Sequence, residues 1–392
     1  MAKTLFDAVY GSIIGGAIGD ALGAPVEGWY YDEIKERFGR ITDFVSARTD
    51  NAPDGPSGVT DDTTLAHYIS LAIIRKGGRV TPDDLRDIWL EKGDNRRFWT
   101  NERIVWHKLR EGMNPWDSGK GTIPAGCATM AIGPIGIINA GNPAQAYQDG
   151  FNIAFVNQDD VNRDAAATLA AGIAAALDPE LVAMDAAQAP AAVERVLAAM
   201  RAHSSFLVRR AIELTEDLAP EGTTVAEFAA RFYDHMLDWA WPRRNWKKEH
   251  FFSGSSLEIV PVVMVLLRLC QSDVNECLIE GASFGRDCDT ISRALGCIAG
   301  ALQGASAIRP EWIEQVERAN EPLFQELEGE PEANFHSLAQ RLIVALESEG
   351  QRAEARAQSL AMLLAPSRRS PGEDGLSGKT SDGDLREGVS DE

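Results

Sequence analysis

The chain has 392 residues, 44% of them hydrophobic and 25% charged, a composition typical of a globular protein with a substantial core. Its formal net charge at pH 7 is −21, and a surface of that charge repels phosphate backbones, which argues against general nucleic-acid binding. The five cysteines form no CxxC pair, so we expect free thiols in a reducing, cytoplasmic compartment. The N-terminus lacks a signal-peptide pattern, and the apolar run 259–267 is shorter than the ~20 residues that span a bilayer, so no membrane association is expected.

The first predicted helix is rich in small residues. Its glycines between positions 11 and 19 each cost about 1 kcal/mol of helix stability against alanine, which close packing against another helix would offset. Asp20 ends this apolar helix, and Glu27 follows a turn that contains Pro25. We interpret Glu27 either as a mobile carboxylate beside a functional site or as a surface residue.

Four polar residues, Thr60-Asp61-Asp62-Thr63, stand directly before a helix predicted over residues 63–74. A threonine or aspartate at that place can cap the free N–H groups of the helix. Capping explains one polar residue of the four. The density of oxygen-bearing side chains therefore indicates a second role for this segment, such as cation binding.

A segment of small residues surrounds Gly126 and Cys127. Such a segment allows a ligand to approach the backbone, although a plain turn explains it equally well. Upstream lie several aromatic residues, among them Trp99, which either stack a base or belong to the core.

The remaining apolar patterns predict more helices, over residues 165–177, 190–202, 257–270, 273–285 and 291–308. Within the second of these, Val193, Val196, Leu197 and Met200 fall on one helical face. Strand-like alternation is rare and no βαβ rhythm occurs, so the predicted fold class is all-α. We expect one domain over residues 1–350 and a disordered acidic tail over 366–392, where large apolar residues almost disappear.

A second dense oxygen cluster, Asp287-Cys288-Asp289-Thr290, precedes the last predicted helix. It has the same chemistry as the cluster at Thr60, and oxygen-only ligands suit a hard cation such as Mg²⁺ or Mn²⁺. Carboxylates packed together without cations repel one another and lose hydration. The two clusters therefore predict a single site, assembled by folding and neutralised by a pair of divalent ions. The sequence has no HExxH motif, and Gly281 to Gly285, which match Gly-x-Ser-x-Gly, lie in a predicted helix and not in the strand-to-helix turn of a nucleophile elbow, which argues against a zinc or serine hydrolase.

With these residues the chain resembles the ADP-ribosylglycohydrolase family over roughly residues 8–310. The resemblance rests on motifs in the right order: residues 15–27, Gly58 to Thr63, and Gly285 to Thr290 with its glycine-spaced helix. It implies a compact orthogonal bundle of helices with a central binuclear metal cleft, and hydrolysis of an N- or O-glycosidic bond to ADP-ribose on a protein side chain or a small acceptor.

The resemblance also implies roles for individual residues. One Mg²⁺ or Mn²⁺ would be held by Thr60, Asp61, Asp62 and Asp289. The other would be held by Asp287, Asp289 and Thr290, with Asp289 bridging. Glu27 matches the glutamate beside the cleft of the family, so Asp62 and Glu27 are candidates for proton transfer.

The chain departs from the family pattern on the substrate side. Arg286 stands where the family often has glycine, and we predict that it binds substrate phosphate or carboxylate, or turns outward into a salt bridge. Gly126 and Cys127 match the segment near the pyrophosphate, where Ala131 replaces the arginine of the family. These departures keep open two alternatives: a glycohydrolase of smaller ribosyl compounds such as nucleosides, and a non-catalytic ligand-binding member of the same fold.

Overall fold

A computed structural model describes residues 3–46, 57–185, 188–240 and 254–364. All regular elements in these ranges are helices, which confirms the all-α fold class. They are α1 (Leu5–Gly23), η1 (Ala24–Val26), α2 (Tyr31–Phe38), α3 (Asp61–Lys76), α4 (Pro82–Lys92), α5 (Thr100–Arg110), α6 (Gly133–Ile138), α7 (Pro143–Ala154), α8 (Val161–Ala176), α9 (Pro179–Val182), α10 (Ala189–Ala202), α11 (Phe206–Glu216), α12 (Val225–Ala240), α13 (Ser256–Leu269), α14 (Val274–Phe284), α15 (Cys288–Gln303), η4 (Ala305–Ala307), α16 (Pro310–Ala319), α17 (Glu321–Leu327) and α18 (Phe335–Leu364).

The chain divides into two compact units, residues 1–350 and 351–392. The first contains the core and all of the predicted site. In the second, the end of α18 over residues 351–364 is solvent-exposed. The predicted disordered tail, 366–392, lies outside the described residues.

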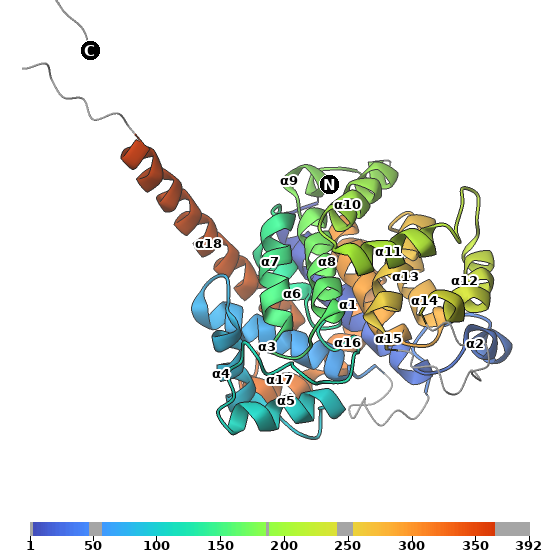
Figure 1. Ribbon diagram of the computed structural model, residues 1–392, viewed down its shortest axis with the longest axis horizontal. Helices are drawn as coiled ribbons and strands as arrows, with labels where there is room; N and C mark the ends of the chain where they lie inside the picture. The colour runs from blue at the N-terminus through green and yellow to red at the C-terminus, as the bar shows by residue number, and fades with distance from the viewer. Residues whose placement is uncertain (1–2, 47–56, 186–187, 241–253, 365–392) are drawn as a thin grey trace, which may run out of the picture. The chain divides into compact units, whose positions relative to one another are not determined.

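Helices α1 and α15 cross at the centre of the first unit (Figure 1), and they form the most extensive helix pair of the fold. Their glycines make this approach possible. A Cβ atom on Gly15 would lie 2.6 Å from the carbonyl oxygen of Gly296, and one on Gly300 would lie 2.1 Å from that of Gly11. The predicted close packing of small residues thus brings the two backbones into contact.

The bounds of α15 correct the sequence prediction. The helix begins at Cys288, three residues earlier than predicted, and ends at Gln303. Gly304 is not part of the glycine stripe inside the helix, because its φ of 86° is left-handed and ends the helix. The earlier start matters for function, since it places Asp289 and Thr290 in the first helical turn.

Helix α8 supports the other side of the core. It packs against α6, α7, α10, α13 and α15. Its alanines and Gly172 are almost all buried, so neighbouring helices approach it closely. The apolar face predicted for α10 is confirmed, because Val193, Val196, Leu197 and Met200 are buried.

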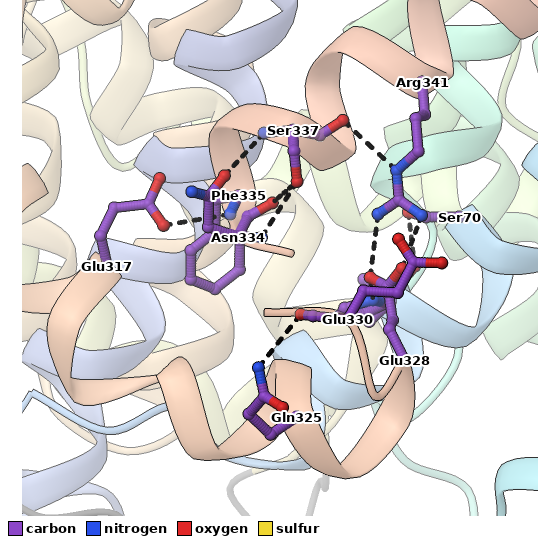
Figure 2. Close-up of polar contacts among 11 residues, drawn as sticks. Ser70, Glu317, Gln325, Glu328, Glu330, Asn334, Phe335, Ser337 and Arg341 are labelled. Atoms are coloured by element: carbon purple, nitrogen blue, oxygen red, sulfur yellow. Dashed lines mark hydrogen bonds and ion pairs between the residues drawn. The ribbon is translucent and has the colours of Figure 1, made fainter. Parts of the chain in front are cut away.

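A polar network joins α17 to α3 and to the start of α18. Figure 2 shows the carboxylate of Glu328, at the end of α17, facing the guanidinium of Arg341, and their Nη2–Oε1 distance is 2.9 Å. The buried His67 of α3 lies with its Nε2 2.7 Å from the same carboxylate. Glu317 accepts a hydrogen bond from the backbone N–H of Phe335 at 3.0 Å. These contacts fasten the end of α17 to His67 in the interior of α3 and to α18, and neither Glu328 nor Arg341 lines the cavity at the N-terminus of α3.

Among the described residues, one helical stretch, Leu5–Val26, is long and apolar enough to cross a membrane by composition. In this fold 72% of its tested window is buried. It is the central core helix α1 together with η1.

Candidate metal centre

The predicted site lies where the N-termini of α3 and α15 meet. Thr60 is the N-cap of α3, and its Oγ1 accepts a hydrogen bond from the backbone N–H of Asp62 at 3.2 Å. Asp287 is the N-cap residue of α15. Thr290 Oγ1 then donates to Asp62 Oδ1 at 3.0 Å, which joins side chains that are 228 positions apart in the chain.

Three carboxylates come together at this junction. One oxygen each of Glu27, Asp287 and Asp289 lie within 4.8 Å of one another. Asp287 and Asp289 are buried, whereas Glu27 is exposed at the end of η1. Oδ1 of Asp289 is buried and has no hydrogen-bond partner in the structure. A buried carboxylate oxygen without a donor is the position at which a cation would be accommodated.

These carboxylates border a cavity of about 200 Å³. Its described lining residues are Glu27, Asp61, Asp62, Trp99, Ala125, Gly126, Cys127, Met130, Gly254, Asp287, Asp289 and Thr290. The structure therefore brings together most of the predicted site residues. Two are not in the lining: Thr60, the buried N-cap of α3, and Arg286.

Gly126 has a steric reason to be glycine. A Cβ atom there would lie 2.6 Å from Cδ1 of Ile259 and 3.4 Å from Oδ2 of Asp287. A side chain at this position would push against the core on one side and the acidic cluster on the other. The small-residue segment predicted from the sequence thus forms one wall of the cavity.

The acidic side chains raise one another's pKa. The pKa of Asp61 lies well above its usual range, because of burial first and then of the charges of Glu102 and Glu27. The pKa of Asp62 is also well above its usual range, because of burial first and then of the charges of Asp20 and Asp61. Burial and the charge of Glu27 raise the pKa of Asp287 to about 7.

The pKa of Asp289 is also well above its usual range, because of burial and then the charge of Glu27. So many carboxylates in one buried place are costly unless positive charge is added. The donor set is entirely oxygen, which fits Mg²⁺ or Mn²⁺.

A family model described as ADP-ribosylglycohydrolase matches residues 1–352. The chain belongs to this family. It is 24% identical over 324 residues to YegU, an uncharacterised protein of Escherichia coli (strain K12), with 80% of this chain and 92% of that protein covered. An uncharacterised protein of Archaeoglobus fulgidus is 24% identical over 310 residues, with 77% and 89% covered.

The family resemblance extends to the fold. A chain from a solved "ADP-ribosylglycohydrolase-related protein complex" matches with a TM-score of 0.59 at 20% identity, covering 86% of this chain and 97% of that one. At this level of identity the match shows a shared fold. The all-α architecture and the family predicted from the motifs are therefore both confirmed.

Asp20 and Arg293 are buried charged residues next to the acidic cluster, and our prediction of the site did not include them. Asp20 accepts hydrogen bonds from the backbone N–H groups of Thr60 at 3.2 Å and Thr63 at 3.1 Å. Arg293 donates to Thr63 Oγ1 at 2.8 Å and to the carbonyl of Met130 at 2.7 Å. Each is a charged residue within the apolar, glycine-bearing part of its helix, which is the sequence signal that could have identified it.

Glu102 of α5 is a second buried acid that the prediction missed. It is 0% exposed, its Oε1 accepts from Nδ2 of Asn157 at 3.2 Å, and its Oε2 has no hydrogen-bond partner. Its charge contributes to the raised pKa of Asp61. The surrounding sequence is polar and charged, so nothing in it distinguishes Glu102 from a surface residue.

Arg286, which departs from the glycine of the family, does not face the cavity. Its side chain is 1% exposed and forms a two-pronged ion pair with Glu258 of α13, in which the Nη2–Oε2 distance is 2.9 Å. The side chain thus forms a salt bridge, but the pair is buried against α13 and does not turn outward as predicted. The guanidinium is therefore engaged within the core.

Proposed function

We propose that this protein is a divalent-metal-dependent glycohydrolase that cleaves an N- or O-glycosidic bond to ADP-ribose, on a protein side chain or a small acceptor. One observation carries the proposal: the N-termini of α3 and α15 and the end of η1 bring Asp62, Asp289 and Glu27 to one cavity. Membership of the ADP-ribosylglycohydrolase family supports it. The free thiols of the chain, four of the five buried, support a cytoplasmic location.

The donor set fits two hard cations. Thr60, Asp61, Asp62 and Asp289 would hold one ion, and Asp287, Asp289 and Thr290 the other, with Asp289 shared. Divalent cations supply positive charge and Lewis acidity at such a site. The helix N-termini that carry these ligands add favourable partial charge to the carboxylates.

Proton transfer in this proposal belongs to Glu27 or Asp62. Hydrolysis needs a base that takes a proton from the attacking water and an acid that protonates the departing group. Glu27 is the exposed carboxylate at the cavity, so it can reach both solvent and substrate. Asp62 is buried and hydrogen-bonded to Thr290, which favours a role in holding the site.

The size of the cavity suggests how a substrate would enter. Its volume of about 200 Å³ is below the range of about 300–1,000 Å³ that is usual for small-molecule pockets. A ribose would therefore enter the acidic end, and the rest of the substrate would extend past Trp99 and the backbone at Gly126.

A second candidate is a glycohydrolase of smaller ribosyl compounds, such as nucleosides. One observation favours it: the described lining residues include no lysine or arginine, and Arg286 is paired with Glu258. Among the described residues, the groups left to bind a pyrophosphate would then be backbone N–H groups.

The test combines a metal titration with a substrate panel. The protein, freed of metal with EDTA, is titrated with Mn²⁺ by calorimetry and assayed on ADP-ribosyl-arginine and on nucleosides. We expect Mn²⁺ binding and Mn²⁺-dependent release of ADP-ribose, both lost in Asp61→Asn and both retained in Asp217→Asn, which changes an exposed aspartate directly after α11. Nucleoside cleavage alone would favour the second candidate. Mn²⁺ binding without any hydrolysis would favour a non-catalytic member of the family. An absence of Mn²⁺ binding would contradict the proposal.

A further inference from the structure

The turn between α14 and α15 is fastened to the turn that carries Glu27. The backbone N–H of Arg286 donates to the carbonyl of Trp29 at 2.6 Å, and the N–H of Gly28 donates to the carbonyl of Arg286 at 2.7 Å. This reciprocal pair joins two segments that are far apart in the sequence. Gly28 directly follows Glu27 in the chain, and Arg286 directly precedes Asp287, so these hydrogen bonds lie next to both carboxylate residues.

The two turns touch without room for further atoms. A Cβ atom on Gly285 would lie 2.7 Å from the carbonyl oxygen of Trp29 and 2.9 Å from the hydroxyl of Tyr233. The Tyr233 hydroxyl donates to the carbonyl of Phe284 at 2.7 Å and accepts from the N–H of Tyr31 at 3.2 Å. The same two turns are thus linked a second time, through helix α12.

Arg286 occupies a backbone conformation that needs support. Its φ is 62°, in the left-handed region that residues with a side chain seldom adopt. Such a conformation persists only where its surroundings determine it. The ion pair with Glu258 supplies this constraint, because it anchors the Arg286 side chain to α13 in the core.

We propose that Arg286 is a positioning residue, whose buried ion pair with Glu258 holds the turn at 285–287 against the Gly28–Trp29 turn and thereby fixes the Glu27 carboxylate beside Asp287 and Asp289. This inference rests on the proposed metal-dependent function, because it assigns to the pair an effect on the acidic cluster. The chain of contacts runs from Glu258 through Arg286 to the backbone after Glu27.

The charge of the pair is consistent with this role. A lone guanidinium next to Asp287 would compete with divalent cations for the cluster, but Glu258 balances it at 2.9 Å. The pair as a whole is neutral, so it can fix geometry without displacing a cation. A glycine at position 286 would allow the turn but would provide no anchor to α13.

The test is a double-mutant cycle read by Mn²⁺ calorimetry. Arg286→Met keeps most of the apolar stem and removes the ion pair. Loss of a residue that supports metal ligands typically costs about 10–100-fold in affinity, so we expect about a tenfold weaker Mn²⁺ Kd. In a Glu27→Gln background the same change should weaken Mn²⁺ binding by less than about threefold, because coupled residues are not additive.

A matched control separates positioning from general stability. Arg341→Met removes another two-pronged Arg–Glu pair, with Glu328, away from the cavity. It should lower thermal stability and leave the Mn²⁺ Kd unchanged. For Arg286→Met, kcat on the active substrate should fall more than KM changes, and Arg286→Lys should restore part of both Mn²⁺ affinity and kcat.

Several outcomes would overturn the inference. Wild-type Mn²⁺ affinity in Arg286→Met contradicts it, and so does an equal loss with and without Glu27. If Arg286→Met does not fold, Glu258→Gln, which retains the shape of the side chain, takes its place in the same cycle. If the wild-type protein itself binds no Mn²⁺, the proposed function fails. If it binds Mn²⁺ and the variants bind equally well, only the positioning role fails.

Discussion

Replacing Asp289 by asparagine should change stability in opposite directions with and without metal. One oxygen of Asp289 lies within 4.8 Å of one oxygen of Asp287, and both side chains are buried. Two unit charges at this separation repel by about 3.5 kcal/mol at an effective dielectric constant of 20. Partial protonation reduces the repulsion, because the pKa of Asp287 is raised to about 7 and the pKa of Asp289 lies well above its usual range. We therefore expect Asp289→Asn to raise the free energy of unfolding of the metal-free protein by about 1–3 kcal/mol.

The metal-bound protein should respond in the other direction. A ligand at 100 times its Kd stabilises the folded state by about 2.7 kcal/mol, and Asp289→Asn should lose this gain, because it removes the carboxylate that we propose the two ion sites share. Unfolding by denaturant in EDTA and in Mn²⁺ measures both effects, with Asp217→Asn as the control. A variant that is less stable than wild type in EDTA, or that keeps the full Mn²⁺ effect, would refute the reasoning.

Three further predictions concern packing, pH and substrate. Gly300→Ala should lower the free energy of unfolding by about 1–3 kcal/mol, because its Cβ would lie 2.1 Å from the carbonyl oxygen of Gly11. Gly350→Ala should not lower it, because a Cβ there has nothing within 4 Å. Denaturant unfolding of the two variants measures the difference. Burial opposes ionisation of Glu328, but hydrogen bonds from His67 and Arg341 outweigh it and lower the pKa of Glu328 to about 2. Its contribution is therefore complete above the ordinary glutamate pKa and disappears as the pH falls through about 2. Glu328→Gln should cost about 2–3 kcal/mol at pH 7, and its difference from wild type should shrink as unfolding is measured at lower pH. Trp99→Ala should raise KM more than it lowers kcat in steady-state assays, because this residue lines the cavity but is not one of the expected metal ligands; an unchanged KM would argue against a substrate path along it.

Local features of the sequence determined much of this protein. Hydrophobic periodicity and the absence of strand patterns predicted the all-α class, since these depend on neighbours within a few positions. Small residues marked α1 and α15 as helices that pack closely, and oxygen clusters at two helix starts indicated a cation site. The end of α15 was placed too late because Gly304 continues the glycine spacing, and only its left-handed φ shows that the helix has stopped.

The tertiary structure alone decided which distant side chains meet. Thr290 reaches Asp62 across 228 positions, and Asp20, Arg293 and Glu102 approach the cluster only because their helices converge there. The direction of Arg286 was open in the sequence, because its partner Glu258 lies 28 positions away on another helix. Residue type fixes which contacts are chemically possible, whereas the packing of α13 against α15 selects the salt bridge from among them. Composition and spacing thus determined the kind of site, and helix packing determined which charges belong to it.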